Sequence, residues 1–335
     1  MAVTIDGFEV DLPPTWAETQ LAQAFEESVV GQLTQSTPLP LGESVIPVYE
    51  GGFEVGYTAE GSPKPVSEVG FDKRTLSPWK FAGIILVSKE AARLNPARML
   101  ENIQADMRNG VSRQIDYGVF YGKSARTGNA VPNATYIDQT SARISVGLDL
   151  AEDVLDAYDA AVEGNPNGDP NGFAFDTRYR TRIARANAVQ NTVGATIPAI
   201  PNLTGAGATV GGLPAAYGRT VSGRVGTQTD TGRVGFVGDW TKGLTWGFAT
   251  SIELQRSTEA TIVDGAGKTW HAFQDNMIAY LIEFTAGWSV NPTMFAAIDG
   301  VAPDESSCPP YSRGACARRV PLGDPQCRHE DRRRT

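Results

Sequence analysis

The pattern of apolar and polar residues predicts three helices before residue 165. The first lies in "PTWAETQLAQAFEESVVGQL", where apolar residues recur at helical spacing and Thr15 with Glu18 forms a capping box. The second begins after Asn95-Pro96 and repeats an apolar residue every four positions, so we expect it to span residues 96–121. The third, "DLAEDVLDAYDAAVEG", has acidic residues in its first turn and glycine at its end.

Elsewhere the apolar period changes to two, which indicates strands. Residues 45–88 are expected to form one long hairpin, with "AEGSPKPVSE" as a polar tip and "WKFAGIILVS" closing the second arm. The alternation on its first arm consists of Phe53, Val55 and Tyr57. Two further strands alternate along residues 246–254 and 278–290. Because helices and strands do not alternate as βαβ units, the expected class is α+β.

Charge narrows the range of functions. The 335-residue chain has 38 acidic and 29 basic residues, a net charge of −9. Such a surface repels nucleic-acid phosphates and anionic lipids, which argues against a DNA-reading protein. The beginning of the chain has neither the basic nor the apolar part of a signal peptide, and no apolar run is long enough to cross a membrane. We therefore expect a cytosolic protein that makes no contact with a membrane.

The last 35 residues differ from the rest in composition. Residues 301–335 have seven arginines, no lysine, five prolines and all three cysteines. This composition is typical of a disordered or appended tail. A zinc site would require Cys308, Cys316, Cys327 and His329, but no two of the cysteines have the short spacing of such sites, so metal binding is not favoured.

One short motif suggests nucleotide binding. Gly267-Lys268-Thr269 matches the end of a P-loop, but the glycine required five positions earlier is Ile262. Asp264-Gly265 is a favoured turn dipeptide between two apolar segments, so the sequence favours a hairpin turn. A nucleotide-binding enzyme remains the remote alternative.

Other charged groups give no catalytic constellation. His271 and His329 are the only histidines, and the acidic residues of the third helix are typical of a solvated face; these are Glu152, Asp153, Asp156 and Asp159. A basic cluster follows residue 175 and consists of Arg178, Arg180, Arg182 and Arg185. It could contact nucleic acid or pair with acidic helices of another subunit, and the acidic chain favours pairing between subunits. We expect no catalytic, cofactor-binding or metal-binding residues.

Several segments, in the same order, resemble the major capsid proteins of tailed bacteriophages, which have the HK97-like fold. The first runs from "AEGSPKPVSEVGFDKRTLSPWKF" into the predicted long helix. It is followed by "GFAFDTRYRTRIARA", "GGLPAAYGRTV", "FVGDWTKGLTWGFATSIELQRS" and "FQDNMIAYLIEFTAGWSVNPTMFAAI". The resemblance covers residues 15–298 and depends on the order of these segments more than on any one of them.

The resemblance implies a division of the chain. Its expected parts are an N-arm with a short helix (1–44), an extended E-loop hairpin (45–88), a first part of the peripheral domain (89–172) with a spine helix (96–121), an axial domain (173–235), a second part of the peripheral domain (236–300) and the tail (301–335). Intersubunit contacts of the E-loop are expected at Glu60, Lys64, Lys73, Arg74 and Lys80.

The resemblance also implies a structural function. The subunits would self-assemble through hexamers and pentamers into an icosahedral shell that encloses double-stranded DNA without reading its sequence. The shell would be the virion capsid, assembled in the cytoplasm of the bacterial host, with portal and scaffold or protease proteins as partners. A scaffolding segment at the N-terminus is not expected, and covalent cross-linking stays open. An encapsulin, a compartment shell of the same fold, is the nearest alternative.

Overall fold

The chain divides into two units, Met1–Gly300 and Val301–Thr335. The computed structural model describes residues 28–300 except positions 41, 43, 52–54, 59, 61–63, 65, 68–69, 95–98, 148–149, 166–168, 181–187, 191–195, 199–208, 211 and 266. Most of the first predicted helix and the whole Arg- and Cys-rich tail lie outside these residues. The last residues of the predicted first helix form a separate short helix, α2 (Val29–Leu33), because its N-cap Ser28 has an extended backbone conformation.

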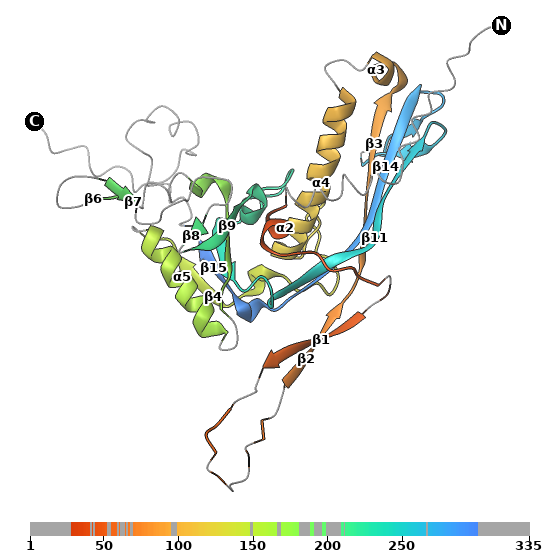
Figure 1. Cartoon of the computed structure of the whole chain (residues 1–335). Coiled ribbons are helices and arrows are strands. Elements are labelled where there is room, and N and C mark those ends of the chain that lie inside the picture. The colour runs from red at the N-terminus through yellow and green to blue at the C-terminus, as the bar shows by residue number, and fades with distance from the viewer. Residues whose placement is uncertain are drawn as a thin grey trace, which may run out of the picture. The chain divides into compact units, whose positions relative to one another are not determined.

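A six-stranded mixed sheet forms one half of the unit that the structure describes (Figure 1). Its order is β4 (Ala142–Ser145), β15 (Phe295–Asp299), β10 (Arg233–Gly238), β5 (Gly172–Phe175), β9 (Leu213–Tyr217) and β8 (Thr209–Val210). The pairs β15–β4 and β5–β9 are parallel, and the other pairs are antiparallel. The sheet therefore combines strands from three of the ranges that the sequence predicts as separate parts of the subunit.

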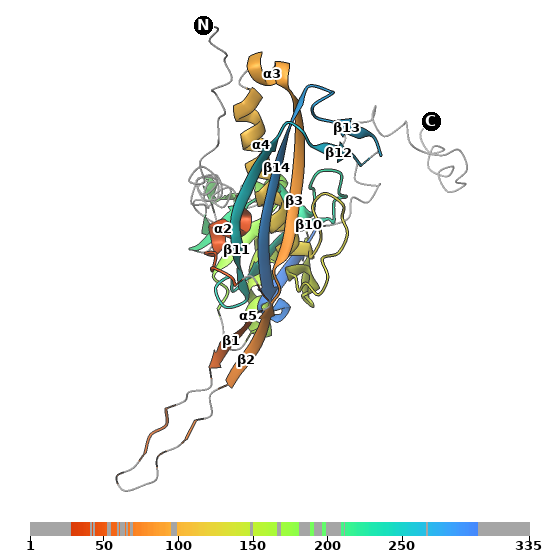
Figure 2. The same ribbon diagram turned by 90° about the vertical axis from the view of Figure 1, so that its right-hand side faces the viewer.

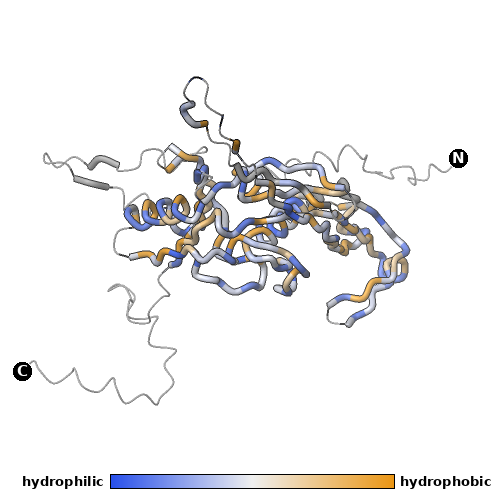
Figure 3. Tube along the Cα trace, turned by 90° about the horizontal axis from the view of Figure 1, so that it is seen from below, coloured by the Kyte–Doolittle hydropathy of each residue, from blue (hydrophilic) through white to orange (hydrophobic). Residues whose placement is uncertain are grey.

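Both faces of the six-stranded sheet are buried. On one face α5 (Leu150–Gly164) packs through one apolar side against Phe173 and Phe175. On the other face Ala174 and Phe236 join a second core that includes the end of the long helix α4 (Met99–Tyr121). The period of two in β5 thus separates two cores. Figure 3 shows apolar and polar residues alternating around α5, as its amphipathic sequence predicts.

A three-stranded antiparallel sheet lies against α4 (Figure 2). Its strands, in spatial order, are β11 (Leu244–Ser257), β14 (Met277–Val290) and β3 (Trp79–Ser88). Aromatic side chains of β3 and β14 form a cluster on this sheet. Phe81 stacks on Phe284 with ring centres 5.3 Å apart, and the ring centre of Trp79 lies 4.6 Å from that of Trp288. The predicted long helix and the strands predicted at 246–254 and 278–290 are confirmed.

The contact between α4 and β14 predicts opposite effects for two glycines of one helix. A Cβ atom at Gly118 would lie 2.5 Å from the Trp288 ring, whereas Gly110 has open space around its Cα. Gly118→Ala should lower the free energy of unfolding by about 1–3 kcal/mol because the ring cannot move without disturbing the core. Gly110→Ala should raise it by up to about 1 kcal/mol, since alanine favours helix. Urea titration of both variants tests this, and equal effects would contradict it.

The observed hairpin has shorter arms than the sequence predicts. β1 (Ser44–Gly51) pairs antiparallel with β2 (Gly70–Leu76), but β3 joins the other sheet after Pro78. Residues 55–58 are not in a strand, so the expected first arm through Val55 and Tyr57 is wrong. Their side chains are 84% and 98% exposed, and none of the strands among the described residues pairs with them. The alternation of apolar and polar residues in the sequence could not show whether another strand pairs with this segment.

The remaining elements are short. They are α3 (Lys89–Leu94), the 3₁₀ turns η2 (Ile137–Gln139), η3 (Thr177–Tyr179), η4 (Arg219–Ser222) and η5 (Pro292–Met294), and the strand pairs β6–β7 (Ala188–Gln190, Thr196–Pro198) and β12–β13 (Thr261–Val263, Thr269–His271). Within the described residues, none of the helices has the length and apolar character that crossing a bilayer requires.

Candidate assembly site

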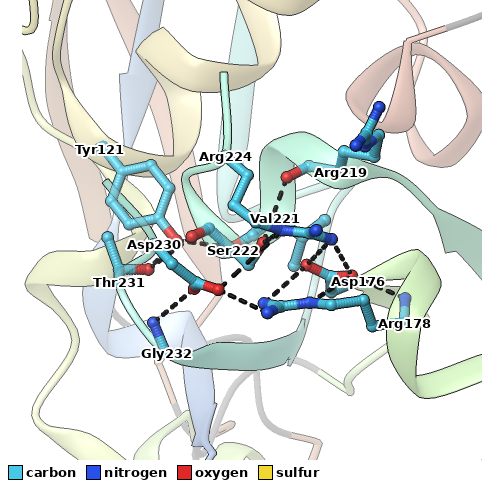
Figure 4. Close-up of polar contacts among 10 residues, drawn as sticks. All are labelled: Tyr121, Asp176, Arg178, Arg219, Val221, Ser222, Arg224, Asp230, Thr231 and Gly232. Carbon is cyan, nitrogen blue, oxygen red and sulfur yellow. Dashed lines mark hydrogen bonds and ion pairs between the residues drawn. The ribbon is translucent and has the colours of Figure 1, made fainter. Parts of the chain in front are cut away.

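A buried carboxylate organises the end of β5, where the predicted basic cluster begins. Asp176 is fully buried and accepts a hydrogen bond from the Arg178 backbone N–H at 2.7 Å, which caps η3. The Arg224 guanidinium donates to both of its carboxylate oxygens, at 2.9 and 3.1 Å. The Arg178 side chain approaches the same carboxylate at 3.2 Å (Figure 4). One acid thus holds two arginines that are 46 residues apart in the sequence.

A second acid extends the network. The Asp230 carboxylate pairs with Arg178 and accepts a hydrogen bond from the Gly232 backbone N–H at 2.8 Å. The Thr231 hydroxyl is 2.8 Å from the Tyr121 hydroxyl at the end of α4 (Figure 4). The network therefore ties the six-stranded sheet to α4.

The electrostatics of this network favour its ionised form. Burial opposes the charge of Asp176, but hydrogen bonds from Ser222 and Arg178 outweigh burial, so the pKa of Asp176 lies below its usual value. For Arg178, burial acts to lower the pKa, but the hydrogen bonds that it donates to Asp230 and Asp176 raise the pKa above its usual value. Each charge of the network thus has an opposite charge as its neighbour.

The arginines that the sequence predicts to pair between subunits of a capsomer have different environments. Arg178 forms its ion pairs within the chain, with Asp176 and Asp230. The Arg180 guanidinium lies over the Tyr217 ring, 5.3 Å from its centre. Arg182 and Arg185 lie outside the described residues. The acidic residues of α5 are on its outer side, as predicted, and Asp153 accepts a hydrogen bond from the Gly147 backbone N–H.

The hairpin residues predicted to contact a neighbouring subunit fall into two groups. Glu60, Lys64 and Lys73 are exposed. Arg74 is buried and donates to the Lys242 backbone oxygen at 2.6 Å, which fixes the base of the hairpin. Lys80 forms an ion pair of 2.8 Å with Glu283 on the neighbouring strand. The last two side chains therefore make contacts within their own subunit.

The sequence reasoning missed a second buried carboxylate, Asp116 in α4. It accepts hydrogen bonds from the Ser28 and Thr220 hydroxyls at 2.6 and 3.0 Å. The Val29 and Val30 backbone N–H groups donate to it at 3.1 Å each. Burial raises the pKa of Asp116, and these four hydrogen bonds counteract the rise in part. The available signal was an acid one residue after Ile115, within an otherwise apolar stretch of the helix.

The segment "GDW" forms a tight turn after β10. The Asp239 carboxylate accepts hydrogen bonds from the backbone N–H groups of Thr241 and Lys242, at 3.0 and 2.9 Å. The Trp240 indole is buried and donates to the Gly172 backbone oxygen at 2.9 Å. This turn supplies the carbonyl that binds Arg74.

The Gly-Lys-Thr triplet lies in a hairpin turn, as the sequence predicts. Asp264 and Lys268 close the loop between β12 and β13 through a backbone hydrogen bond of 2.9 Å. Gly267 has φ +82°, a conformation that favours glycine. The Lys268 ammonium lies over the Trp270 ring, 3.4 Å from its centre.

Lys268→Ala should therefore have a small effect. The exposed cation–π contact contributes up to about 1 kcal/mol, so the melting temperature should fall by only a few degrees. Nucleotide titration should detect no binding to either protein. Nucleotide binding by the parent chain that disappears in the variant would contradict this interpretation.

The described part of the chain has no cluster of three or more His, Cys, Asp or Glu side chains that could hold a metal ion. His271 lies in β13, where its Nδ1 is 3.2 Å from the Thr261 hydroxyl. The three cysteines and His329 lie outside the described residues.

Comparison with known proteins gives a consistent set of relatives. Residues 10–299 match the phage capsid family. Two curated relatives carry the name "Probable major capsid protein gp17". The one from Mycobacterium phage D29 is 29% identical over 139 residues, 42% of each chain. The one from Mycobacterium phage L5 is 28% identical over 139 residues, 42% of this chain and 41% of the relative. The matches thus span less than half the length of these relatives.

Solved structures extend the likeness to the fold. A chain of Gordonia phage Cozz has a TM-score of 0.66 and 26% identity, covering 82% of this chain and 87% of the other. A chain of Mycobacterium phage Ogopogo has a TM-score of 0.62 and 21% identity, covering 82% and 92%. A third, from "Capsid of empty GTA particle computed with C5 symmetry", has a TM-score of 0.52 and 12% identity, covering 82% and 90%.

Proposed function

Because this chain belongs to the phage capsid family, whose model matches residues 10–299, we propose that it is a major capsid protein that builds the head shell of a tailed phage. It acts as a structural protein and not as an enzyme. Within the shell the β1–β2 hairpin serves as the E-loop, α4 as the spine helix, and the segment before β1 as the N-arm. Copies of the chain assemble through hexamers and pentamers, with portal and scaffold or protease proteins as partners.

The observation that carries this proposal is the exposure of the hairpin. Large apolar side chains on and beside β1 and β2 are uncovered, with exposed fractions from 57% to 98%; they are Val45, Val55, Tyr57, Val66 and Phe71. A monomer gains nothing from holding apolar groups in water, whereas a neighbouring subunit that covers them removes that cost. Glu60, Lys64 and Lys73 lie in the same region and supply polar contacts at the rim.

The charge of the chain suits a container for DNA. A net charge of −9 disfavours tight binding of phosphates, so packaged DNA would be enclosed without being gripped. Arg178 has carboxylate partners within its own subunit and is not a free phosphate ligand. Pairing between subunits through Arg180, Arg182 and Arg185 stays a prediction.

Negative-stain microscopy of the purified protein tests the proposal. We expect closed shells, or rings of five or six subunits. A monomer under all assembly conditions would refute the shell function. Particles isolated from the producing cells should contain nuclease-protected double-stranded DNA. Particles that instead contain a protein cargo would identify an encapsulin.

The hairpin can be tested separately by changing Tyr57, whose side chain is almost fully exposed. Tyr57→Asp should leave the melting temperature of the unassembled subunit unchanged, because the ring makes no core contact. Assembly should fall at least about tenfold, since a buried unpaired carboxylate costs more than 1.4 kcal/mol at an interface. Tyr57→Phe is the matched control and should assemble normally. Sedimentation gives the assembled fraction, and full assembly of Tyr57→Asp would exclude a buried contact at this residue.

A further inference from the structure

Residues 28–40 form a short segment that precedes the hairpin and is held in place along most of its length. Val29, Val30 and Leu39 are buried, whereas Gln35 to Pro38 between them are exposed. The chain before residue 28 lies outside the described residues, and the link to β1 passes through Gly42, which has open space around it. The contacts of this segment resemble those of a bound peptide more than those of a loop.

A carboxylate fixes the first end of the segment. The Asp116 oxygens bind the Ser28 hydroxyl and the backbone N–H groups of Val29 and Val30, all three from the start of α2. The Ser28 hydroxyl also accepts a hydrogen bond from the Gly31 N–H at 3.1 Å. A helix of five residues has little stability of its own, so the rest of the subunit must hold it in this conformation.

Glycines make room for the segment along its path. A Cβ atom on Gly218 would overlap the Val29 side chain, and one on Gly247 would overlap the Thr37 carbonyl. The same atom on Gly172 would lie 3.1 Å from Leu33, and on Gly287 3.0 Å from Leu39. Four glycines thus line a groove that any larger residue would narrow; they come from β5, the N-cap of η4 and the three-stranded sheet.

The second end of the segment makes two backbone hydrogen bonds to the edge of a sheet. The Thr37 and Leu39 N–H groups donate to the Trp246 and Phe248 backbone oxygens on the free edge of β11, at 2.8 and 2.9 Å. Pro38 stands between them, and its nitrogen carries no hydrogen for further pairing. Addition of a strand to a sheet edge, with pockets for alternate side chains, is a common mode of peptide recognition.

We infer that this groove, lined by Asp116, Gly172, Gly218, Gly247 and Gly287, is a peptide-binding site for the segment 28–40, which a second copy of the chain can fill as well as its own. The recognition groups are a carboxylate for a capped helix start and a strand edge for a Thr-Pro-Leu sequence. None of them depends on the covalent link through residues 41–43.

Cutting the link in the full-length chain tests the site. A protease recognition sequence replaces residues 41–43, and the folded protein is cleaved and passed over a sizing column. We expect fragment 1–40 to remain with the body. A labelled peptide of residues 26–40, added in excess, should then exchange into the groove. A fragment that separates at once, or a labelled peptide that never binds, would overturn the inference.

Peptide variants identify the recognition groups without disturbing the body. Ser28→Ala in the labelled peptide removes a hydroxyl bound to Asp116 and should raise its dissociation rate at least about tenfold. Ser28→Thr keeps the hydroxyl and should retain most of the affinity. Gln35→Ala changes an exposed side chain and is the matched control. Equal rates for the Ser28→Ala and Gln35→Ala peptides would show that the carboxylate does not recognise the segment.

Discussion

Asp116→Ala is expected to lower the free energy of unfolding by about 2–5 kcal/mol, a large part of the stability of an ordinary domain. The carboxylate is buried and accepts four hydrogen bonds, so alanine leaves four donors facing a cavity. The Ser28 and Thr220 hydroxyls can turn toward other acceptors. The Val29 and Val30 backbone N–H groups cannot turn, and each unpaired group costs about 1–3 kcal/mol.

Urea titration of the unassembled subunit measures this effect. Asp106→Ala is the matched control, since Asp106 lies on the exposed side of the same helix. Asp116→Asn should be intermediate, because its amide oxygen still accepts while its NH₂ group faces a backbone donor. Equal unfolding midpoints for Asp116→Ala and Asp106→Ala would contradict the role assigned to this carboxylate.

Asp176→Asn is expected to have the next largest effect, about 2–4 kcal/mol at neutral pH. The carboxylate is fully buried and neutralises Arg178 and Arg224. Removing one partner of a buried ion pair leaves the other charge uncompensated, which costs about 3–5 kcal/mol in a dry interior. We place the effect lower because the two arginine side chains are 42% and 27% exposed and water screens them in part.

The effect of Asp176→Asn should depend on pH. Because the pKa of Asp176 is lower in the folded than in the unfolded chain, its ionised form stabilises the fold. That stabilisation is complete above the unfolded pKa of about 3.9 and is lost as the pH falls through the folded value. Between pH 7 and about 4 the difference between parent and variant should therefore stay nearly constant, and it should shrink as the pH is lowered from about 4 to 3. The exposed Asp159→Asn is the control, and a difference that stays constant over this range would refute the ionic role.

The sequence predicted best those elements whose pattern is local. The long helix, α5, β11, β14 and the turn at Asp264 all have a clear period or turn signal, and all are confirmed. The short strands β4, β10 and β15 were missed. They contribute few residues each, and β10 and β15 are buried on both faces, so they lack the alternation that indicates a half-buried strand.

The site was harder to predict because its partners are distant in the sequence. Charge alone placed Arg178 in a basic cluster, but its acids are Asp176, two residues before it, and Asp230, 52 residues after it. A helical pattern assigns an acid such as Asp116 to the solvent face. Only the tertiary structure shows that Ser28 and Thr220 meet it. The conformation of the hairpin was also hard to predict, since its large apolar side chains are mostly exposed in the part of the subunit that the structure describes.

The groove for residues 28–40 affects the order in which the chain can fold during synthesis. Leu39 lies against Gly287, so its site is incomplete until nearly the whole chain has left the ribosome. At about 5–20 residues per second, roughly 12–50 s separate the synthesis of these two residues. Throughout that interval the burial site of Leu39 is incomplete. In a cell that makes many copies at once, the waiting segment of one nascent chain can meet the finished groove of another before its own groove exists.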